Sequence, residues 1–264
     1  MNRIDNLFQT KGKDILSIYF TAGFPDLNDT AIILQQLQDS GADMVEVGIP
    51  FSDPMADGVV IQESSHHALQ NGMNLDILFE QLEQVKTNIT MPIILMGYLN
   101  PVFKYGMEKF CKRCVSAGVS GVIIPDLPLE LYINDYATLF TKFNLFYIPL
   151  VTPQTPDHRI EKLGRESKGF VYMVSTASIT GSRPNLENSS DYFLRVRKIL
   201  PDTPLLIGFG IQDASSFNTA SKYANGGIIG TAFIKALKEV SEQTEHTKAL
   251  RQKSDDFIKN IRGN

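Results

Sequence analysis

The sequence predicts a (β/α)8 barrel with an additional N-terminal helix, and three observations predict this fold. Short apolar runs rich in β-branched residues alternate with amphipathic helical segments along all 264 residues. Runs such as 92–96 (PIILM) and 121–125 (GVIIP) are apolar without interruption, which is typical of parallel strands buried on both faces. The chain contains eight strand–helix units, the number that closes such a barrel. The alternative, a doubly wound sheet, is disfavoured because no GxGxxG motif follows the first strand.

Turn residues bound the expected strands, and capping residues bound the expected helices. Asn28 or Asp29 caps the helix after the first strand, and Gly41 ends it. Gly118 ends the helix before the fourth strand, and Pro156 begins the helix after the fifth. The expected strands are 15–21, 44–47, 92–97, 121–125, 145–150, 170–175, 204–210 and 226–230. The expected helices are an N-terminal one and 28–40, 60–71, 75–86, 107–117, 129–142, 156–166, 189–200, 213–222 and 241–261.

Composition limits the classes of function. Apolar residues make up 43% of the chain, enough to build one large core, and no Pro/Ser-rich linker divides it. We therefore expect residues 1–264 to form a single domain. The net charge of −4 gives no basic field for nucleic acid. We find neither a signal peptide nor an apolar run near the roughly 18 residues of a membrane span, so a cytoplasmic protein without nucleic-acid or membrane partners is expected.

The segment 45–62 (VEVGIPFSDPMADGVVIQ) contains three carboxylates around one strand end, which is typical of a reaction centre. Glu46 lies inside an apolar strand, where a carboxylate costs free energy unless it has a partner or a task. Asp53 and Asp57 follow in a loop rich in glycine and proline. Strand alternation places Glu46 on the same face as Met44 and Gly48, and desolvation there should raise its pKa toward neutrality. Asp53 is interpreted as a residue that orders the loop.

Polar and glycine residues gather where the expected strands end, the position of active sites in barrels. GFG at 208–210 and GT at 230–231 follow the last two strands, and a short helix is expected to start at Thr231. Backbone N–H groups and the positive end of such a helix favour a phosphate. The alternative is that these glycines only make tight turns. The long loop 175–188 is interpreted as a lid over this site or as an ordinary surface loop.

Cys111 and Cys114 are spaced as a CxxC motif, which suggests either a redox or metal pair or two cysteines near one face of a helix. The second interpretation is favoured because a zinc site needs about four ligands and no other Cys/His cluster accompanies the motif. The chain's four histidines show no spacing typical of metal ligands, so no metal is expected.

Five segments together resemble the tryptophan synthase alpha subunit family, in the family's order and from the first strand to the last. They are EVGIPFSDPMADG (46–58), LMGYLNPVFKYG (95–106), PDLPLE (125–130), YMVSTASITG (172–181), and GFGI with GIIGTA (208–211 and 227–232). The resemblance implies retro-aldol cleavage of indole-3-glycerol phosphate to indole and glyceraldehyde 3-phosphate, with no cofactor in this chain. It also implies a pyridoxal-phosphate-dependent beta subunit as partner, in an assembly of two alpha and two beta chains, which receives the indole.

The resemblance also implies roles for individual residues. Glu46 would handle the protons of the reaction, and Asp57 would accept the indole N–H and stabilise positive charge on the ring. Asp126 would help to transmit lid closure. Residues expected to line the indole pocket are Tyr19, Ile61, Tyr98, Tyr172 and Phe209, and those expected to hold phosphate are Thr180, Gly181, Gly210, Gly230 and Thr231.

Two positions depart from the family pattern, and two alternative functions remain. Ser178 stands where glycine is common in the lid, and Thr231 where serine is common. An indole-glycerol-phosphate synthase is one alternative, but it needs a catalytic lysine at a strand end, and none of the expected strands offers one. A non-catalytic subunit that binds substrate and activates a partner is the other, and the Glu46–Asp57 pair argues against it. The partner interface is expected near Pro50, Pro101 and Pro128.

Overall fold

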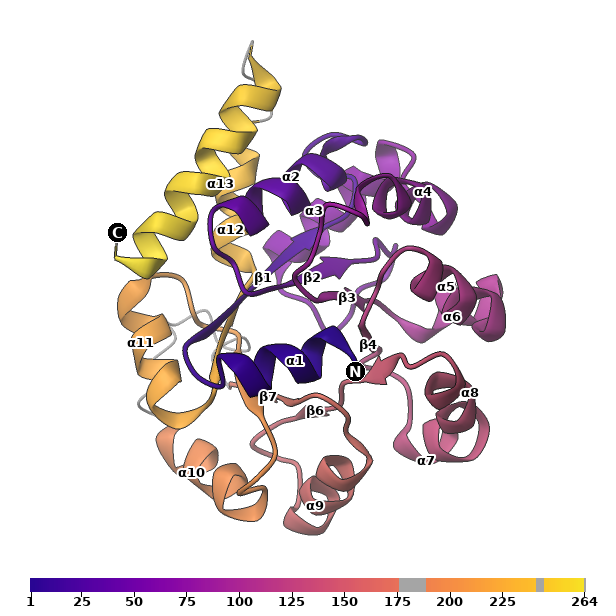
Figure 1. The fold of residues 1–264 in the computed structure, drawn as a ribbon, viewed down its shortest axis with the longest axis vertical. Coiled ribbons are helices and arrows are strands. Elements are labelled where there is room, and N and C mark those ends of the chain that lie inside the picture. The colour runs from indigo at the N-terminus through magenta and orange to yellow at the C-terminus, as the bar shows by residue number, and fades with distance from the viewer. Residues whose placement is uncertain (176–188, 241–244, 264) are drawn as a thin grey trace.

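The computed structural model describes residues 1–175, 189–240 and 245–263, and it places parallel strands inside a ring of helices (Figure 1). All pairings between neighbouring strands are parallel, in the order β5-β4-β3-β2-β1-β9-β8-β7-β6. The strands are β1 (Ile15–Thr21), β2 (Met44–Gly48), β3 (Ile93–Met96), β4 (Gly121–Ile123), β5 (Phe146–Tyr147), β6 (Leu150–Val151), β7 (Val171–Val174), β8 (Leu205–Gly208) and β9 (Gly226–Ile229).

The expected fifth strand, 145–150, is wrong as one continuous element, because it is divided into β5 and β6. Pro149 lies at the break, and proline has no N–H to donate to a strand ladder. The two halves pair with different neighbouring strands: the Ile148 amide donates to the Val122 carbonyl in β4, whereas the Pro149 carbonyl accepts from the Tyr172 amide in β7. Since β5 and β6 are separated by two residues, this passage joins the two ends of the sheet and completes the predicted barrel.

The helices agree with the expected positions to within a few residues, with three differences. Residues 129–142 contain a π-helical turn at Tyr132–Tyr136, and α5 was not expected. Pro101 is tolerated in α5 because it lies in the first turn, where no N–H is needed. The last helix begins later than expected, and 241–244 lie outside the described residues. The helices are α1 (Arg3–Thr10), α2 (Asp29–Asp39), α3 (Val59–Gln70), α4 (Leu75–Val85), α5 (Leu99–Tyr105), α6 (Met107–Ser116), α7 (Leu129–Leu131), α8 (Ala137–Lys142), α9 (Asp157–Glu166), α10 (Ser190–Ile199), α11 (Ala214–Tyr223), α12 (Thr231–Lys238) and α13 (His246–Arg262).

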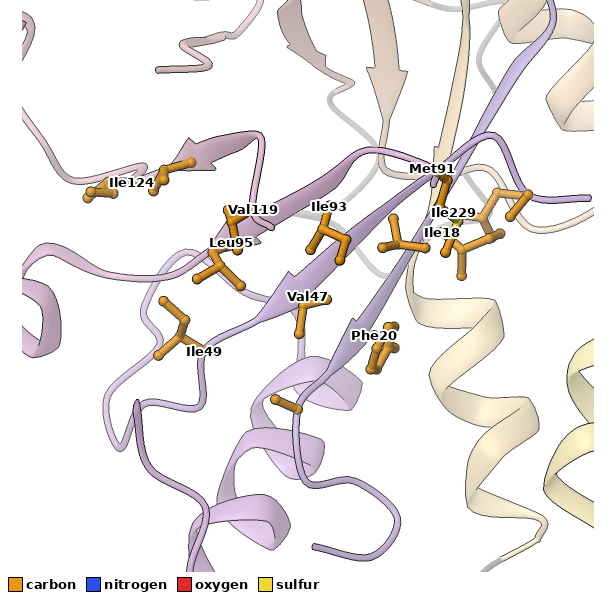
Figure 2. Close-up of a cluster of buried hydrophobic side chains, with 14 of the residues drawn as sticks. Ile18, Phe20, Val47, Ile49, Met91, Ile93, Leu95, Val119, Ile124 and Ile229 are labelled. Carbon is orange, nitrogen blue, oxygen red and sulfur yellow. The ribbon is translucent and has the colours of Figure 1, made fainter. Parts of the chain in front are cut away.

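The fold has two hydrophobic cores, one inside the ring of strands and one between the strands and the helices. The larger one lies between strands and helices, and Figure 2 shows Ile18, Val47 and Leu95 projecting from neighbouring strands into it. The smaller one fills the barrel interior with residues that include Met44, Ile94 and Leu206. The predicted N-terminal helix α1 lies across the barrel (Figure 1), and its fully buried Ile4 belongs to the inner core. Helix α1 therefore plugs the end of the barrel opposite the carboxyl ends of the strands.

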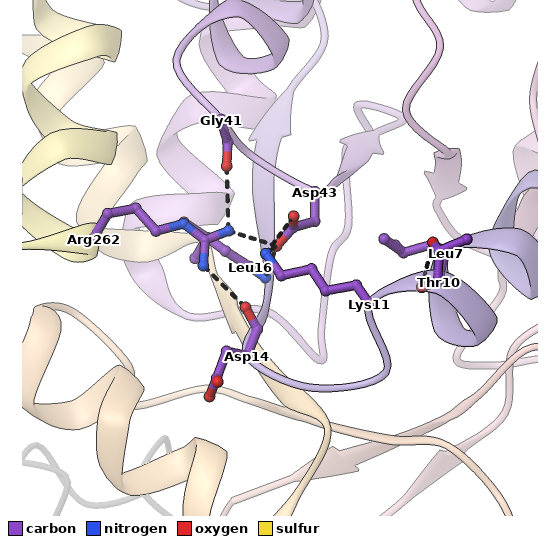
Figure 3. A network of polar contacts seen from close by, with 8 residues as sticks. All are labelled: Leu7, Thr10, Lys11, Asp14, Leu16, Gly41, Asp43 and Arg262. Carbon is purple, nitrogen blue, oxygen red and sulfur yellow. Dashed lines mark hydrogen bonds and ion pairs between the residues drawn. The ribbon is translucent and has the colours of Figure 1, made fainter.

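A polar network around Asp43 ties both ends of the chain to this plugged end (Figure 3). The Asp43 carboxylate accepts hydrogen bonds from the Lys11 ammonium at 2.6 and 2.7 Å and from the Leu16 amide at 2.8 Å, and it also pairs with the Arg262 guanidinium. Arg262 in turn donates to the backbone carbonyl oxygens of Asp14 and Gly41. The start of β2 is thus fixed to α1, β1 and α13 together.

Cys111 and Cys114 are free thiols buried in α6, and burial raises the pKa of both, to about 12 for Cys111. Thiols with raised pKa values are poor nucleophiles, which supports the interpretation of the CxxC motif as two core residues on a helix. Among the described residues, no helix is long and apolar enough to cross a membrane.

Candidate active site

A cavity of about 410 Å³ opens at the carboxyl ends of the strands. It lies between the ends of β1, β2, β3, β7, β8 and β9 and reaches the first turn of α12. A volume of this size suits a small organic ligand. Its lining residues are Tyr19, Glu46, Asp57, Gly58, Ile61, Met96, Tyr172, Phe209, Gly210, Ile211, Gln212, Ile228, Gly230, Thr231, Ala232 and Lys235.

Glu46 is fully buried at the base of this cavity. Its neighbours in the sheet are Tyr19 on β1 and Ile94 on β3. The Ser17 hydroxyl donates to one carboxylate oxygen at 3.2 Å, and the other oxygen has no hydrogen-bond partner among the described residues. Desolvation raises the pKa of Glu46 to about 8, although the Ser17 hydrogen bond lowers it slightly. Glu46 is therefore mostly protonated at neutral pH, and its free oxygen is available to a ligand.

Asp57 approaches the same cavity from the β2–α3 loop. The Tyr98 hydroxyl donates to its carboxylate at 3.1 Å and accepts a hydrogen bond from the Ala56 amide at 3.0 Å. Partial burial raises the pKa of Asp57 to about 6, while the Tyr98 hydrogen bond lowers it. Asp57 is therefore mostly ionised at pH 7. The two carboxyl groups differ in charge at neutral pH because their environments differ.

Two tyrosines line the cavity near the two carboxyl groups. Tyr19 and Tyr172 are held against two glycines: a side chain at Gly48 would overlap the Tyr19 ring, and one at Gly208 would overlap Tyr172. Burial raises the pKa of both phenols well above its usual range, so both stay neutral. The absence of Cβ atoms at these strand ends is therefore what allows aromatic rings to occupy the barrel mouth.

The opposite end of the cavity is lined by backbone and by the start of α12. Phe209 and Gly210 have φ angles of 67° and 79°, a left-handed conformation that is unusual for phenylalanine and marks a constrained turn. The Ser175 hydroxyl fixes this turn by donating to the Phe209 carbonyl at 2.9 Å. Gly230 precedes α12, and no side chain caps that helix. Gly230, Thr231 and Ala232 line the cavity, so the N-terminal end of α12 borders it, an arrangement that favours anions.

The structure brings most of the expected site residues together. Glu46, Asp57, Tyr19, Ile61, Tyr172, Phe209, Gly210, Gly230 and Thr231 all line the cavity. Tyr98 does not line it: it lies in a smaller adjoining hollow and reaches the site through its hydrogen bond to Asp57. Thr180, Gly181 and Ser178, with all but the first residue of the expected lid, lie outside the described residues.

Sequence reasoning missed six lining side chains: Met96, Ile211, Gln212, Ile228, Ala232 and Lys235. Met96 ends β3, and an inward position at a strand end could have identified it. Lys235 lies four residues after Thr231, so helical periodicity places both on the same face of α12. That spacing was a usable signal. Gln212 follows the Gly210 turn and had no comparable pattern.

Asp126 and Asp53 have local partners. Asp126 accepts a hydrogen bond from the Leu99 amide at 2.8 Å, at the start of α5. Because Tyr98 precedes Leu99, the loops after β2, β3 and β4 are joined through Asp57, Tyr98 and Asp126. Asp53 is exposed and accepts from the Ser52 hydroxyl next to it, as expected of a residue that orders its own loop.

One group of polar side chains far apart in the sequence meets away from the cavity. His246 Nε2 lies 2.8 Å from an Asp29 oxygen and 3.3 Å from an Asp26 oxygen. Spacing along the chain could not reveal this cluster, because His246 begins α13 and the two aspartates lie more than 200 residues earlier. The cluster joins α13 to the start of α2.

The fold and the cavity define a class of protein: a barrel enzyme with paired carboxyl groups and an uncapped helix N-terminus in one pocket. Residues 6–262 match the profile of the family described as tryptophan synthase alpha chain. The chain belongs to this family. Its members are lyases of tryptophan biosynthesis that act on indole-3-glycerol phosphate, and the sequence prediction of a carbon–carbon lyase is confirmed at this level.

Named relatives and a solved structure agree with this assignment. The tryptophan synthase alpha chain of Parabacteroides distasonis is 51% identical over 251 residues, covering 95% of this chain and 98% of that protein. The alpha chain of Flavobacterium johnsoniae is 50% identical over 240 residues, covering 90% and 94%. The crystal structure of tryptophan synthase subunit alpha from Legionella pneumophila is 34% identical and superimposes with a TM-score of 0.88 over the full length of both chains.

Proposed function

We propose that this chain cleaves indole-3-glycerol phosphate to indole and glyceraldehyde 3-phosphate, with Glu46 as the acid–base group and Asp57 as the group that stabilises the charged indole. The observation that carries these roles is the pairing, in one cavity, of a buried protonated carboxyl group with a partly exposed ionised one. A retro-aldol cleavage that expels indole needs one proton donor and one fixed negative charge, and the two groups supply them separately.

The proposed steps balance in protons and electrons. The carboxyl group of Glu46 donates its proton to C3 of the indole ring, and positive charge develops at the ring nitrogen. The Asp57 carboxylate accepts the N–H hydrogen bond and stabilises that charge. The bond between C3 and the side chain then breaks, its electron pair returns to the ring, and the Glu46 carboxylate takes the proton of the adjacent hydroxyl as the aldehyde forms. Glu46 ends the cycle protonated.

Substrate orientation follows from the two ends of the cavity. The rings of Tyr19 and Tyr172, with Ile61 and Phe209, provide flat apolar walls suited to an indole. Gly210, Gly230 and Thr231 lie where the helix N-terminus would receive the phosphate. We propose the same role for Thr180 and Gly181 on the family resemblance alone. These steps use side chains and backbone amides of this chain, and pyridoxal phosphate is assigned to the partner.

Indole release by the isolated chain tests these roles. Glu46→Gln and Asp57→Asn should each reduce kcat by about a thousandfold or more, because each removes a group that acts in the transition state. Circular dichroism and thermal melting would establish that both variants remain folded. Activity close to that of the unmodified chain in both variants would contradict the mechanism, and an inactive unmodified chain that still bound substrate would favour a non-catalytic subunit.

We also propose that the carboxyl face of the barrel binds a tryptophan synthase beta subunit, as two alpha and two beta chains. The support is three exposed apolar side chains in the segments that follow β2 and β3: Met55 in the β2–α3 loop is 92% exposed, Val59 at the start of α3 69%, and Phe103 in α5 65%. Of the prolines expected at the interface, Pro128 is exposed, whereas Pro50 is buried and cannot itself contact a partner. Apolar side chains grouped around an active-site mouth are typical of protein–protein contacts.

Stimulation of indole release by an added beta subunit tests this partnership. Phe103→Ser should weaken the stimulation by roughly tenfold or more in the concentration of beta subunit required, as expected for a buried aromatic contact. Leu194→Ser is the matched control, since Leu194 is 56% exposed on α10, away from this surface. Equal effects of the two variants would contradict the proposed interface, and sedimentation of the complex would test its stoichiometry.

A further inference from the structure

Lys235 is a cation in a cavity whose other charged lining groups are acidic. The described lining residues include three that can carry charge: Glu46, Asp57 and Lys235. Lys235 belongs to α12 and follows Thr231 by one helical turn, so it lies on the face of that helix that borders the cavity. The two acids lie at the indole end of the proposed pocket, whereas Lys235 comes from the element that forms the anion end.

No hydrogen bond or ion pair occupies the Lys235 ammonium among the described residues. Lys238, on the same helix, differs in this respect because its ammonium pairs with Glu63 at 3.1 Å and it does not line the cavity. Lysine at the solvent-facing end of a cavity can move its ammonium over several ångströms on its flexible stem. The Lys235 ammonium therefore stabilises no other described residue through a hydrogen bond or ion pair. It lies at the mouth of a site that favours anions.

We propose that Lys235 is the counter-cation for the phosphate group of the substrate, acting in addition to the backbone N–H groups of Gly210, Gly230 and the first turn of α12. The proposal rests on the proposed function and extends it, because it assigns the charge that selects a phosphorylated substrate. A phosphate monoester carries close to two negative charges at neutral pH, and an uncapped helix end compensates only about half a unit charge. Lys235 supplies a full one.

Two features determine which kinetic constant should change: the phosphate is remote from the breaking bond, and Lys235 is exposed to solvent. The phosphate takes no part in bond cleavage, so its attraction to Lys235 is the same in the ground state and the transition state. Loss of such an interaction raises KM and leaves kcat unchanged. Because Lys235 is exposed, salt screens the attraction, and the effect should be largest at low ionic strength. We call Lys235 a positioning residue, because it contacts a group remote from the reacting bond.

The test compares Lys235→Met, Lys235→Arg and the control Lys238→Met in indole release at low salt and at 0.5 M salt. Lys235→Met should raise KM about tenfold at low salt, with kcat within twofold of the unmodified chain, and the difference should shrink at high salt. Lys235→Arg should restore most of the affinity, and Lys238→Met should change neither constant. A fall in kcat without a change in KM, or an equal KM in all variants, would overturn the proposal.

Direct binding separates this proposal from the proposed function. Calorimetric titration with inorganic phosphate requires no turnover, and Lys235→Met should weaken its binding about tenfold while leaving indole binding unchanged. If the unmodified chain released no indole, the proposed function would fail, yet a phosphate affinity that depends on Lys235 would still support the charge assignment. Phosphate binding unaffected by Lys235→Met would overturn the assignment even in an active enzyme.

Discussion

Asp43 and Glu46 lie three residues apart at and within β2, yet their environments are opposite. Asp43 is held at the plugged end of the barrel by Lys11, Arg262 and the Leu16 amide, so its negative charge is compensated on all sides. Glu46 lies at the open end, fully buried, with one hydrogen bond from Ser17 and one free oxygen. One carboxylate is satisfied by the protein, and the other is left for a ligand.

The difference shows that carboxyl groups at the two ends of one strand can have separate roles, one in stability and the other in function. A carboxylate with complete partners stabilises the native state, and removing it leaves buried donors unpaired. A desolvated carboxyl group with raised pKa destabilises the native state at neutral pH, because the unfolded chain can ionise and the folded chain resists it. In this barrel the two conditions occur at opposite ends, as expected when loops at the carboxyl face carry the chemistry.

Asp43→Ala should have the largest effect on stability. Arg262, Lys11 and the Leu16 amide would lose their acceptor in a mostly buried position, and the side chain of Asp43 is only 14% exposed. We expect a loss of about 3 kcal/mol in the free energy of unfolding by urea denaturation. The control is Glu108→Ala, an exposed partner of Lys112, which should cause no measurable change. An unchanged free energy of unfolding in Asp43→Ala would contradict the proposed difference between the two ends of the barrel.

Glu46→Gln, in contrast, should increase the free energy of unfolding at neutral pH. Gln retains an acceptor for Ser17 but cannot ionise. The pKa of Glu46 is raised to about 8 in the folded state, so the wild type loses stability as pH rises from about 4.5 to 8, and the variant should not. We expect the variant to be about 2 kcal/mol more stable at pH 7 and no more stable at pH 4. Equal stability of the two proteins across this range would mean that Glu46 ionises freely.

Tyr98→Phe should have a smaller effect, on activity. The Tyr98 hydroxyl fixes Asp57 and lowers its pKa, so its loss should reduce kcat/KM about fivefold, the equivalent of one hydrogen bond. In the wild type, kcat/KM should rise with pH as Asp57 ionises near 6 and fall as Glu46 ionises near 8. The variant should move only the acidic limb, toward higher pH. A shift of the basic limb would show that Tyr98 acts on Glu46 instead.

His246→Gln should have the smallest effect, and the loss of stability should be confined to low pH. Burial lowers the pKa of His246, but the hydrogen bond and charge of Asp29, with Asp26, raise it overall. The ion pair therefore stabilises the fold fully below about pH 6.5 and is lost as pH rises through the raised pKa. Thermal melting should show the variant destabilised by about 0.5 kcal/mol at pH 5.5 and unchanged at pH 9. Destabilisation that persists at pH 9 would indicate a role in packing rather than charge.

Much of the candidate site could be read from local sequence. Glu46 could be identified because a carboxylate in an apolar strand costs free energy unless it has a partner or a function, and strand alternation places it inside the barrel. The glycines at 210 and 230 could be assigned to an anion site because each follows a strand and one precedes a helix. Lys235 was missed because its role depends on where α12 points. The sequence could not place Tyr98 in detail, since direct contact with the cavity and contact through Asp57 look the same in a sequence.

The sequence by itself determined the eight strand–helix units and the order of the barrel, because hydrophobic periodicity and capping residues act over a few neighbouring positions. It also determined that Glu46 would be desolvated. Only the tertiary structure decided that Pro149 divides one strand between two neighbours, that Asp43 gathers both chain ends, and that His246 meets Asp29. These contacts join residues far apart in the chain, and their energies depend on distances and burial that exist only after the barrel has closed.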